Sequence, residues 1–497
     1  MYLALALALS CSGKDADTAA EAPAAFPDDF YWGAATAGFQ VEPGCPTISA
    51  EVCEDRGSDW YQWVTDEALI GESATHLAGE PLSAAPGHYE LYEEDIARLK
   101  DELGANALRV SIEWSRLFPD RAAEAATTVD ELAAFVDPEA LAWYHAYFQA
   151  MRDQGIEPFV TLNHYTLPLW LHDGKACYYD IDGCADRGWL DGDRIIPAIA
   201  LYSGFCAREF GGEVDWWMTL NEPFAVILSG YLLPGEDRTN PPGVTLEVDY
   251  AFEVLWNMVE AHARMYDAVH AEDPTAMVGL VPNLVAAYPE DEDDPIDVEG
   301  TAALDYLYNR LMLNATIRGE VDRDLDRVAE STDADLAGRM DFIGVNYYTR
   351  LTVMGLEAPL FADYPGSTFY PVGSFWQNYP EGLREVLNLA AEYELPVVVT
   401  ENGTPDPDGE EGAQSLVRHA QALRDAIGDG VDLRGYLYWS LVDNYEWNHG
   451  MSMTFGLYEV PPTDPEKPRS PRLVADLYSQ IVQANAIPED LEAEYGE

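Results

Sequence analysis

The chain has 497 residues, 48% of them hydrophobic, and its 89 acidic and 27 basic residues give a formal net charge of −62. This length and composition suit a soluble globular protein with one very large core or two ordinary ones. Nucleic acid is excluded as a natural partner, because its phosphates would be repelled. The acidic residues are spread along the whole chain and only four basic residues are lysines. We therefore expect an acidic surface and hypothesise adaptation to high salt, which screens charges over ~3 Å at 1 M.

Residues 1–25 are predicted to form a lipoprotein-type export signal followed by a tether. A short apolar run, residues 3–9, is too brief to span a bilayer and is followed by Ser10, Cys11 and a polar segment. The run departs from the usual signal in having no basic residues before it. If Cys11 is lipidated, the protein is exported and anchored to a membrane, in the periplasm or on the cell surface of a bacterium. An ordinary N-terminus is the alternative.

Four further cysteines form two close pairs, Cys45 with Cys53 and Cys177 with Cys184, in segments rich in Gly, Pro, Asp and Ser. Outside the cell such pairs are plausible loop disulfides. Metal binding is the weaker alternative, because neither pair has a two-residue ligand spacing or a clear histidine partner. Cys206 is the odd one, and we expect it to be a small buried hydrophobe.

Eight short apolar or β-branched segments alternate with helical patterns along the chain, which predicts an α/β fold built as a single (β/α)8 barrel. The predicted helix over residues 92–103 places Tyr92, Ile96, Leu99 and Leu103 on one face, and Gly104 ends it. An open doubly wound sheet is the alternative, but no phosphate-cradling glycine motif follows the first strand. We expect a catalytic domain over residues 26–485 with elaborated rim loops, and an acidic C-terminal tail over residues 486–497. The predicted strands are residues 30–37, 107–114, 157–163, 213–221, 276–283, 341–348, 396–401 and 433–441.

Polar and aromatic residues gather at the carboxyl ends of these strands, the face at which barrel enzymes work. Glu222 and Glu401 each end a buried apolar run, where a carboxylate is too costly to keep in a core without a partner. Paired carboxylates at such a rim point to glycoside hydrolysis. The other candidates in or after the strands are Gln40, Glu42, Arg109, Glu113, His164, Asn221, Asn346, Tyr348, Trp439, Glu446 and Trp447.

At these residues the sequence resembles glycoside hydrolase family 1, the retaining β-glucosidases and β-galactosidases, from Phe26 to about Tyr478. The motifs that carry the resemblance include FPDDFYWGAATAGFQVE, NHYTLPLWL, TLNEP, DFIGVNYYTR, VVVTENG and GYLYWSLVDNYEW. NHYTLPLWLHD and DNYEW are closer to the archaeal type of β-glycosidase than to plant members. Tyr165 departs from the pattern, because many relatives have Trp there.

The resemblance implies that Glu401 is the nucleophile and Glu222 the acid/base, with Arg109, Asn221 and Tyr348 assisting. It implies that Gln40, His164, Asn346, Trp439, Glu446 and Trp447 bind the sugar, with Trp439 as a stacking floor. Glu446 would repel a 6-phosphate, which favours an unphosphorylated sugar. The substrate is then a small β-glycoside or oligosaccharide, with no metal or organic cofactor. The choice among glucose, galactose and fucose stays open.

Three alternative functions differ from hydrolysis in the acceptor or in the two glutamates. A transglycosidase would pass the sugar to an acceptor other than water. A thioglucosidase of the plant type would lack the acid/base glutamate, which Glu222 supplies here. A non-catalytic sugar-binding barrel would have lost Glu222 or Glu401, and both are present.

Overall fold

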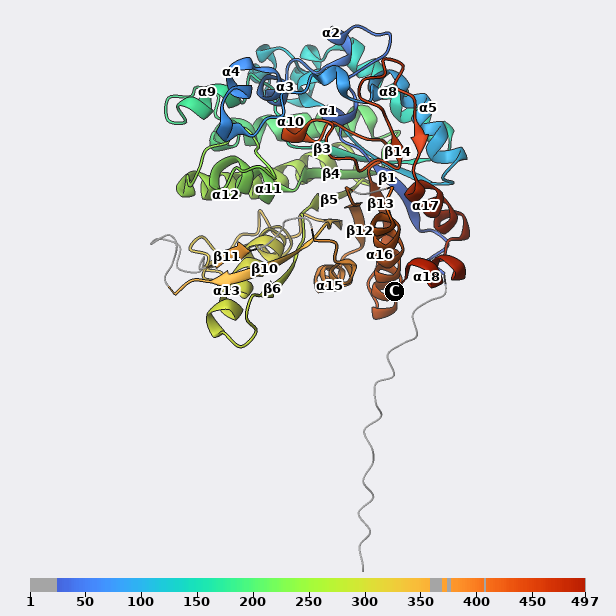
Figure 1. Ribbon diagram of the computed structural model, residues 1–497. Coiled ribbons are helices and arrows are strands. Elements are labelled where there is room, and N and C mark those ends of the chain that lie inside the picture. Colours follow the sequence, from blue (N-terminus) through green and yellow to red (C-terminus); the bar gives the residue numbers. More distant parts are fainter. Residues whose placement is uncertain (1–24, 358–368, 373–376, 406–407, 497) are drawn as a thin grey trace, which may run out of the picture.

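The protein, described by a computed structural model over residues 25–357, 369–372, 377–405 and 408–496, is built round a closed barrel of eight parallel strands (Figure 1). The predicted (β/α)8 barrel is confirmed, and each of the eight predicted strands corresponds to one barrel strand. The open doubly wound sheet is thereby excluded. Round the barrel the strands are β1 (Tyr31–Ala35), β2 (Ala107–Ser111), β3 (Glu157–Asn163), β4 (Trp216–Asn221), β5 (Met277–Val281), β9 (Phe342–Asn346), β12 (Val397–Asn402) and β13 (Leu433–Trp439).

The barrel interior is filled by a cluster of buried side chains to which all eight strands contribute. This cluster is separate from the core between strands and helices. Because successive side chains of a strand point to opposite faces, the residues between the inward-facing ones point outward to the helices. The inner residues are Ala35, Ala107, Phe159, Met218, Val281, Phe342, Val398 and Leu437.

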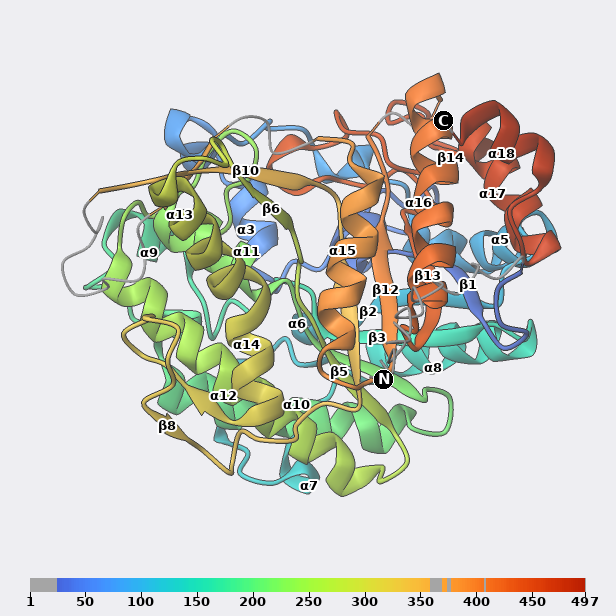
Figure 2. The ribbon, with the colours of Figure 1, turned by 90° about the horizontal axis from the view of Figure 1, so that it is seen from below.

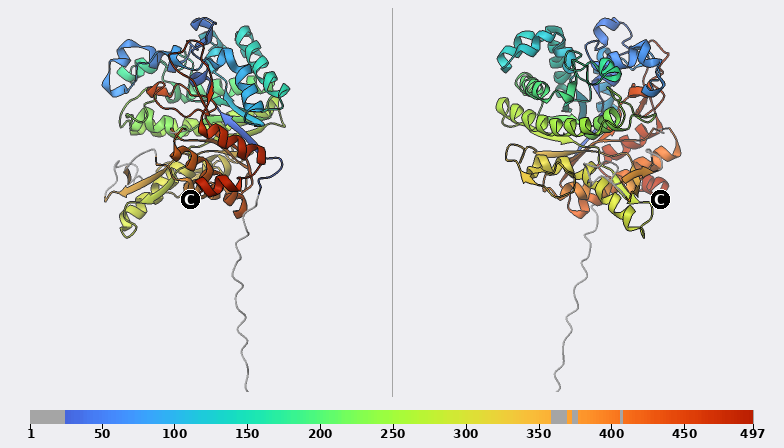
Figure 3. Two further views of the ribbon diagram at one scale, coloured as in Figure 1. Left: turned by 45° about the vertical axis from the view of Figure 1, so that its right-hand side comes forward. Right: turned by 90° about the vertical axis from the view of Figure 1, so that its left-hand side faces the viewer.

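Helices surround the strands on every side, as the views from below and from two sides show (Figures 2 and 3). The predicted helix over residues 92–103 lies within α5 (His88–Asp101) and its continuation, and Gly104 adopts a left-handed φ of 77° after it, a conformation that glycine accepts without strain. The other long helices are α8 (Pro138–Asp153), α10 (Gly192–Phe210), α12 (Val248–Glu272), α13 (Pro295–Asp305), α15 (Pro380–Ala391), α16 (Glu410–Asp429) and α17 (Leu473–Ala484).

Most of the extra chain length lies in short elements between these units. A small sheet of β6 (Ala286–Pro289), β10 (Arg350–Gly355) and β11 (Phe369–Val372) extends from one side, and two hairpins pair β7 (Glu320–Val321) with β8 (Ser331–Thr332) and β14 (Tyr458–Glu459) with β15 (Ser470–Pro471). The short helices are α1 (Gly38–Val41), α2 (Ala50–Cys53), α3 (Asp59–Thr65), α4 (Glu67–Ile70), α6 (Trp114–Leu117), α7 (Val129–Leu132), α9 (Gly174–Tyr179), α11 (Pro223–Ile227) and α14 (Leu311–Leu313).

The two ends of the described barrel meet. The Phe26 amide donates to the Asn485 carbonyl at 2.9 Å, and the Asn485 side chain donates back to the Phe26 carbonyl at 2.9 Å. Beyond Asn485, where we expected an acidic tail, the chain forms α18 (Glu489–Tyr495), whose Glu492 pairs with Arg424 at 2.9 Å. None of the helices in the described ranges is long and apolar enough to cross a membrane. The predicted export signal, including Cys11, lies outside the described residues.

Both cysteine pairs are joined as disulfides, Cys45 to Cys53 and Cys177 to Cys184. Cys206 on α10 is free and fully buried, and burial raises the pKa of its thiol. It therefore packs as a small hydrophobe rather than acting as a reactive thiol.

Candidate active site

A cavity of about 210 Å³ opens at the carboxyl ends of the barrel strands. Eight of the predicted site residues line it, namely Gln40, His164, Glu222, Tyr348, Glu401, Trp439, Glu446 and Trp447. They come from six of the eight barrel strands or the segments that follow them. The barrel therefore collects these residues in one place although they are far apart in sequence.

Glu401 ends β12 and is held by two donors. Its Oε1 forms an ion pair with the Arg109 guanidinium, and its Oε2 accepts a hydrogen bond of 2.8 Å from the Tyr348 hydroxyl. Burial raises the pKa of Glu401, Arg109 acts against this shift, and the negative charge of nearby Glu222 adds to it. The guanidinium and the phenol stabilise negative charge on Glu401, as a nucleophilic carboxylate needs.

Glu222 follows β4 and begins α11. It adopts a left-handed φ of 44°, which is uncommon for a residue other than glycine and typical of functional sites. Its Oε1 accepts 2.8 Å from the Asn346 amide and its Oε2 accepts 2.5 Å from the Tyr165 hydroxyl. Its donors are thus a neutral amide and a neutral phenol, whereas Glu401 is paired with a cation.

A hydrogen-bonded layer beneath the cavity connects the two carboxyls. Arg109 donates to Asn221 Oδ1 at 2.7 Å, and Asn346 donates to the same oxygen at 3.1 Å. Asn221 in turn donates to His164 Nε2 at 3.1 Å. Arg109, Asn221 and Asn346 are not among the residues that line the cavity. In this structure they orient the residues that do.

The opposite wall presents polar groups beside aromatic rings. The Gln40 amide nitrogen donates to Glu446 Oε2 at 2.9 Å, while the buried Gln40 Oε1 and His164 Nδ1 have no hydrogen-bond partner in the described part of the chain. Burial and the charges of Arg109 and Arg238 hold the pKa of His164 well below its usual range, so its ring is neutral. The ring lies 6.0 Å from Trp439 and 5.9 Å from Trp447. Unpaired polar atoms beside aromatic rings fit the polar edge and apolar face of a pyranose.

Arg238 is a wall residue that the sequence did not predict. It follows β4 and α11, and its Nη2 donates to Glu446 Oε1 at 2.7 Å. Its guanidinium carbon lies 6.0 Å from the Tyr165 ring centre and 5.9 Å from that of Trp447, while no described residue forms a hydrogen bond with its buried Nη1. Glu446 thus has a cationic partner inside the cavity.

The segment around Arg238 is also fixed to the loop after β13. The Asn448 side chain donates to the Glu236 carbonyl at 3.1 Å, and His449 Nε2 contacts the Asp237 carbonyl at 2.9 Å. Together with the pair between Arg238 and Glu446, these bonds join residues 235–239 to residues 446–449. We call this connection the cross-rim clamp. It closes one side of the cavity.

Asn283 and Tyr308 also line the cavity without having been predicted. Asn283 follows β5 and forms a β-bridge with Asn346, and its place as the last residue of the predicted strand 276–283 was an available signal. Tyr308 lies on a π-helical turn, residues 306–310, with no motif to mark it.

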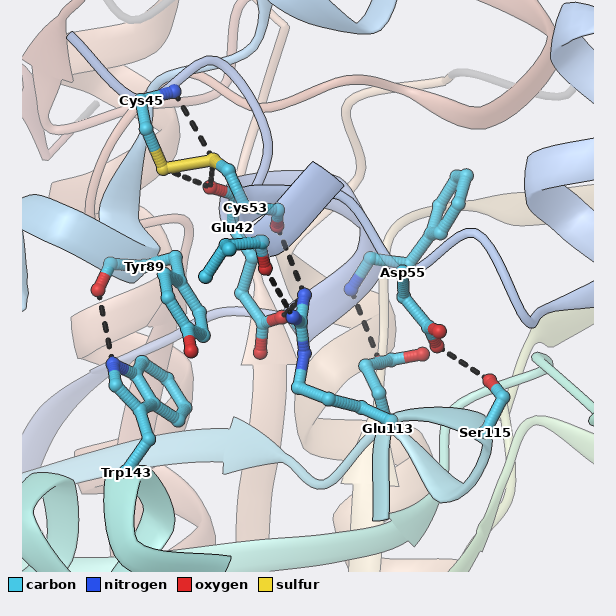
Figure 4. Close-up of polar contacts among 12 residues, drawn as sticks. Glu42, Cys45, Cys53, Asp55, Tyr89, Glu113, Ser115 and Trp143 are labelled. Atoms are coloured by element: carbon cyan, nitrogen blue, oxygen red, sulfur yellow. Dashed lines mark hydrogen bonds and ion pairs between the residues drawn. A yellow bond between two sulfur atoms is a disulfide. The ribbon is translucent and has the colours of Figure 1, made fainter. Parts of the chain in front are cut away.

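Glu42 and Glu113 are not among the residues that line the cavity. Glu113 follows β2 rather than lying within it, and with Glu42 and Asp55 it forms a buried group of three carboxyls beside the Cys45–Cys53 disulfide (Figure 4). Arg116 donates to Glu42 at 2.7 Å. Burial, with the charges of Glu42 and Asp55, raises the pKa of Glu113 to about 8. Glu113 accepts from the Phe39 amide at 3.1 Å and thereby holds α1, which carries Gln40.

The chain is similar to known proteins over nearly its whole length. Over residues 22–487 the chain matches the model of glycosyl hydrolase family 1. It is 32% identical to a β-galactosidase of Pyrococcus woesei, covering 94% of this chain and 99% of the relative, and 33% identical to one of Sulfolobus acidocaldarius, covering 94% and 97%. The crystal structure of the β-glycosidase of Thermosphaera aggregans superposes with a TM-score of 0.81 at 28% identity, covering 95% and 99%. Family, fold and pocket agree, and the chain belongs to glycosyl hydrolase family 1.

Proposed function

We propose that this enzyme is a retaining exo-β-glycosidase that removes terminal non-reducing β-D-glycosyl residues, with Glu401 as nucleophile and Glu222 as acid/base. The observation that carries the proposal is the unequal pairing of two buried carboxyls on one cavity. Glu401 has a guanidinium partner, and Glu222 has two neutral donors. This is the difference that a pair needs when one member must begin ionised and the other protonated.

In the first step Glu401 attacks the anomeric carbon while Glu222 gives its proton to the departing oxygen. A covalent glycosyl ester forms on Glu401, and the aglycone leaves as a neutral alcohol. Esterification removes the negative charge that Glu401 carried. In the second step Glu222, now a carboxylate, takes a proton from water, which attacks the same carbon from the side the aglycone left. The ester bond to Glu401 breaks, and its carboxylate is restored. Two inversions at one carbon give net retention.

The wall residues suit an unphosphorylated sugar. The unpaired oxygen of Gln40 and the unpaired nitrogens of His164 and Arg238 supply both acceptors and donors for ring hydroxyls. Arg238 compensates the charge of Glu446. The repulsion of a 6-phosphate by Glu446 is therefore weaker than the sequence suggested. β-Glucosides are the first candidates, with β-galactosides and β-fucosides next.

Variants of the two glutamates test the assignment. Glu401→Ala should lower kcat on p-nitrophenyl β-glucoside by about 10⁴-fold or more, because no covalent intermediate can form. Glu222→Ala should lose about 10²- to 10⁴-fold on unactivated glycosides. Azide should restore its turnover of the activated aryl glycoside and yield a β-glycosyl azide. Proton NMR of the first product formed by the wild type should show the β-anomer, and an α-anomer would refute retention.

We also propose that the enzyme works outside the cytoplasm and at high salt concentration. The support is the pair of loop disulfides, which persist in oxidising compartments, and the net charge of −62. Cell fractionation with a palmitate label at Cys11 tests the anchor, since Cys11→Ser should release the enzyme from the membrane fraction.

A further inference from the structure

The hairpin of β7 and β8 carries an unusual run of acids. Between its two strands the chain reads Asp322, Asp324, Asp326 and Glu330, with one residue between successive aspartates. In the Ca²⁺ loop of an EF-hand, oxygen ligands come from positions 1, 3, 5, 7 and 9, with the carbonyl at position 7. Counting Asp322 as position 1 places an acid at positions 3, 5 and 9.

The fold brings three of these acids together. One carboxylate oxygen from each of Asp322, Asp324 and Glu330 lies within 4.8 Å of the other two. Ca²⁺ binds oxygens at about 2.3–2.6 Å, so two oxygens on one ion are at most about 5 Å apart. A single Ca²⁺ ion can therefore reach all three oxygens.

Asp322 is also buried, and one of its carboxylate oxygens is unpaired within the described ranges. Only 1% of the residue is exposed. Its Oδ2 accepts 2.9 Å from the Arg327 amide, whereas its buried Oδ1 has no hydrogen-bond partner among the residues that the structure describes. The Tyr306 side chain and the Leu325 amide are its other polar neighbours. A buried carboxylate oxygen without a full partner is costly unless a cation compensates it.

The two arginines of the loop do not supply that cation. The Arg323 guanidinium lies 4.7 Å from the ring centre of Trp256 on α12, and Arg327 pairs with Glu299 on α13. Both side chains fasten the hairpin to neighbouring helices. Arg327 has a left-handed φ of 71° at position 6, where the EF-hand loop uses glycine for its sharp turn.

We propose that the β7–β8 hairpin binds one Ca²⁺ ion through Asp322, Asp324 and Glu330. Ca²⁺ fits better than Mg²⁺, because a loop of flexible carboxylates offers many oxygens without strict octahedral geometry. The site is shorter than an EF-hand: position 12 is Asp333, and its carboxylate accepts from the Asp335 amide at 2.8 Å. The hairpin precedes β9, at the end of the barrel opposite the cavity, so the ion stabilises the fold and takes no part in turnover.

The test is calorimetric titration of the full chain, freed of metal by a chelator, with CaCl2 and separately with MgCl2. Both titrations are run in 1 M NaCl, which screens the loose binding of cations to an acidic surface. We expect one Ca²⁺ per chain, with a Kd between about 10⁻⁵ and 10⁻³ M. At a hundredfold excess over Kd the unfolding temperature should rise by roughly 3 °C. Mg²⁺ should bind at least about tenfold more weakly.

Two variants separate the site from general acidity. Asp324→Asn, at an exposed position, should weaken Ca²⁺ binding at least about tenfold and abolish the thermal shift. Asp293→Asn removes the same charge from another exposed acidic loop and should leave both unchanged. Glu330→Gln repeats the test if Asp324→Asn folds poorly. Equal Ca²⁺ binding by Asp324→Asn and the wild type, or no saturable binding at all, would overturn the proposal.

Discussion

Tyr165 joins the acid/base to the sugar-binding wall. Its hydroxyl is 2.5 Å from Glu222 Oε2, and its ring lies 4.9 Å from that of Trp447. Glu222 must take a proton from water in the second step, and the donated bond holds its carboxylate in place for that step. The departure from Trp noted in the sequence therefore places a hydroxyl on the reacting group.

We predict that Tyr165→Phe slows the second step more than the first. Without the donated bond the Glu222 carboxylate is held by the Asn346 amide alone, so kcat on an activated aryl β-glucoside should fall about 10-fold. The measurement is steady-state kinetics, in which a slower second step lowers kcat and KM together and leaves kcat/KM nearly unchanged. A changed KM with an unchanged kcat would mean that Tyr165 only shapes the wall.

We predict that Arg238→Met weakens substrate binding. Removing one partner of a buried ion pair leaves the charge of Glu446 uncompensated, so kcat/KM should fall about 10- to 100-fold, mainly through KM. Arg238→Lys keeps the charge and should recover part of the loss. Steady-state kinetics on glucoside and galactoside provide the check. Wild-type kcat/KM in Arg238→Met would show that the cross-rim clamp does not affect the sugar.

Sequence reasoning located the two glutamates but not Arg238, for a physical reason. Glu222 and Glu401 end buried strands, and strand ends are visible as the point where an apolar run stops. Arg238 lies in an irregular segment between Glu236 and Thr239, and its place depends on which distant loop it meets. No pattern in the neighbouring sequence indicates which loop Arg238 contacts.

The same contrast holds for whole elements. All eight barrel strands were predicted because each buries nearly its whole length, but four-residue helices such as α1 were not. Helix α1 owes its position to Glu113, whose carboxyl accepts from the Phe39 amide and whose neighbour Ser111 binds the Gly38 amide at 2.8 Å. These contacts come from β2 and the residue that follows it closely, so the sequence of α1 alone does not predict a helix there.

Glu113 gives a prediction about stability and pH. Its pKa is about 8 in the folded protein against 4.5 for the ordinary group, so the folded state holds the proton more tightly. The stabilisation is complete below pH 4.5 and is lost as pH rises towards 8, by roughly 5 kcal/mol at most. The wild-type unfolding temperature should therefore fall from pH 5 to 8, and Glu113→Gln should flatten this fall. Exposed Glu290→Gln is the control, and an equal fall in Glu113→Gln and the wild type would contradict the prediction.

At the scale of the whole molecule, the net charge determines how stability depends on salt. A net charge of −62 repels itself in the compact state, and molar salt screens this repulsion. We predict that the unfolding temperature at pH 7 rises by several degrees between 0.05 and 2 M NaCl. Near the isoelectric point of about 4.1 the net charge vanishes, so the rise should largely disappear at pH 4.5. An unfolding temperature at pH 7 that stayed constant with salt would contradict the hypothesis of salt adaptation.

The meeting of Phe26 and Asn485 has a practical consequence. Both residues lie where the chain enters the barrel at the amino ends of the strands, whereas the cavity opens at the carboxyl ends. Anything attached upstream of Phe26, whether an acyl chain in a bilayer or a resin on a column, joins the molecule on the side facing away from the cavity. An enzyme immobilised through that end should keep the opening of its active-site cavity directed toward the surrounding solution and its substrates.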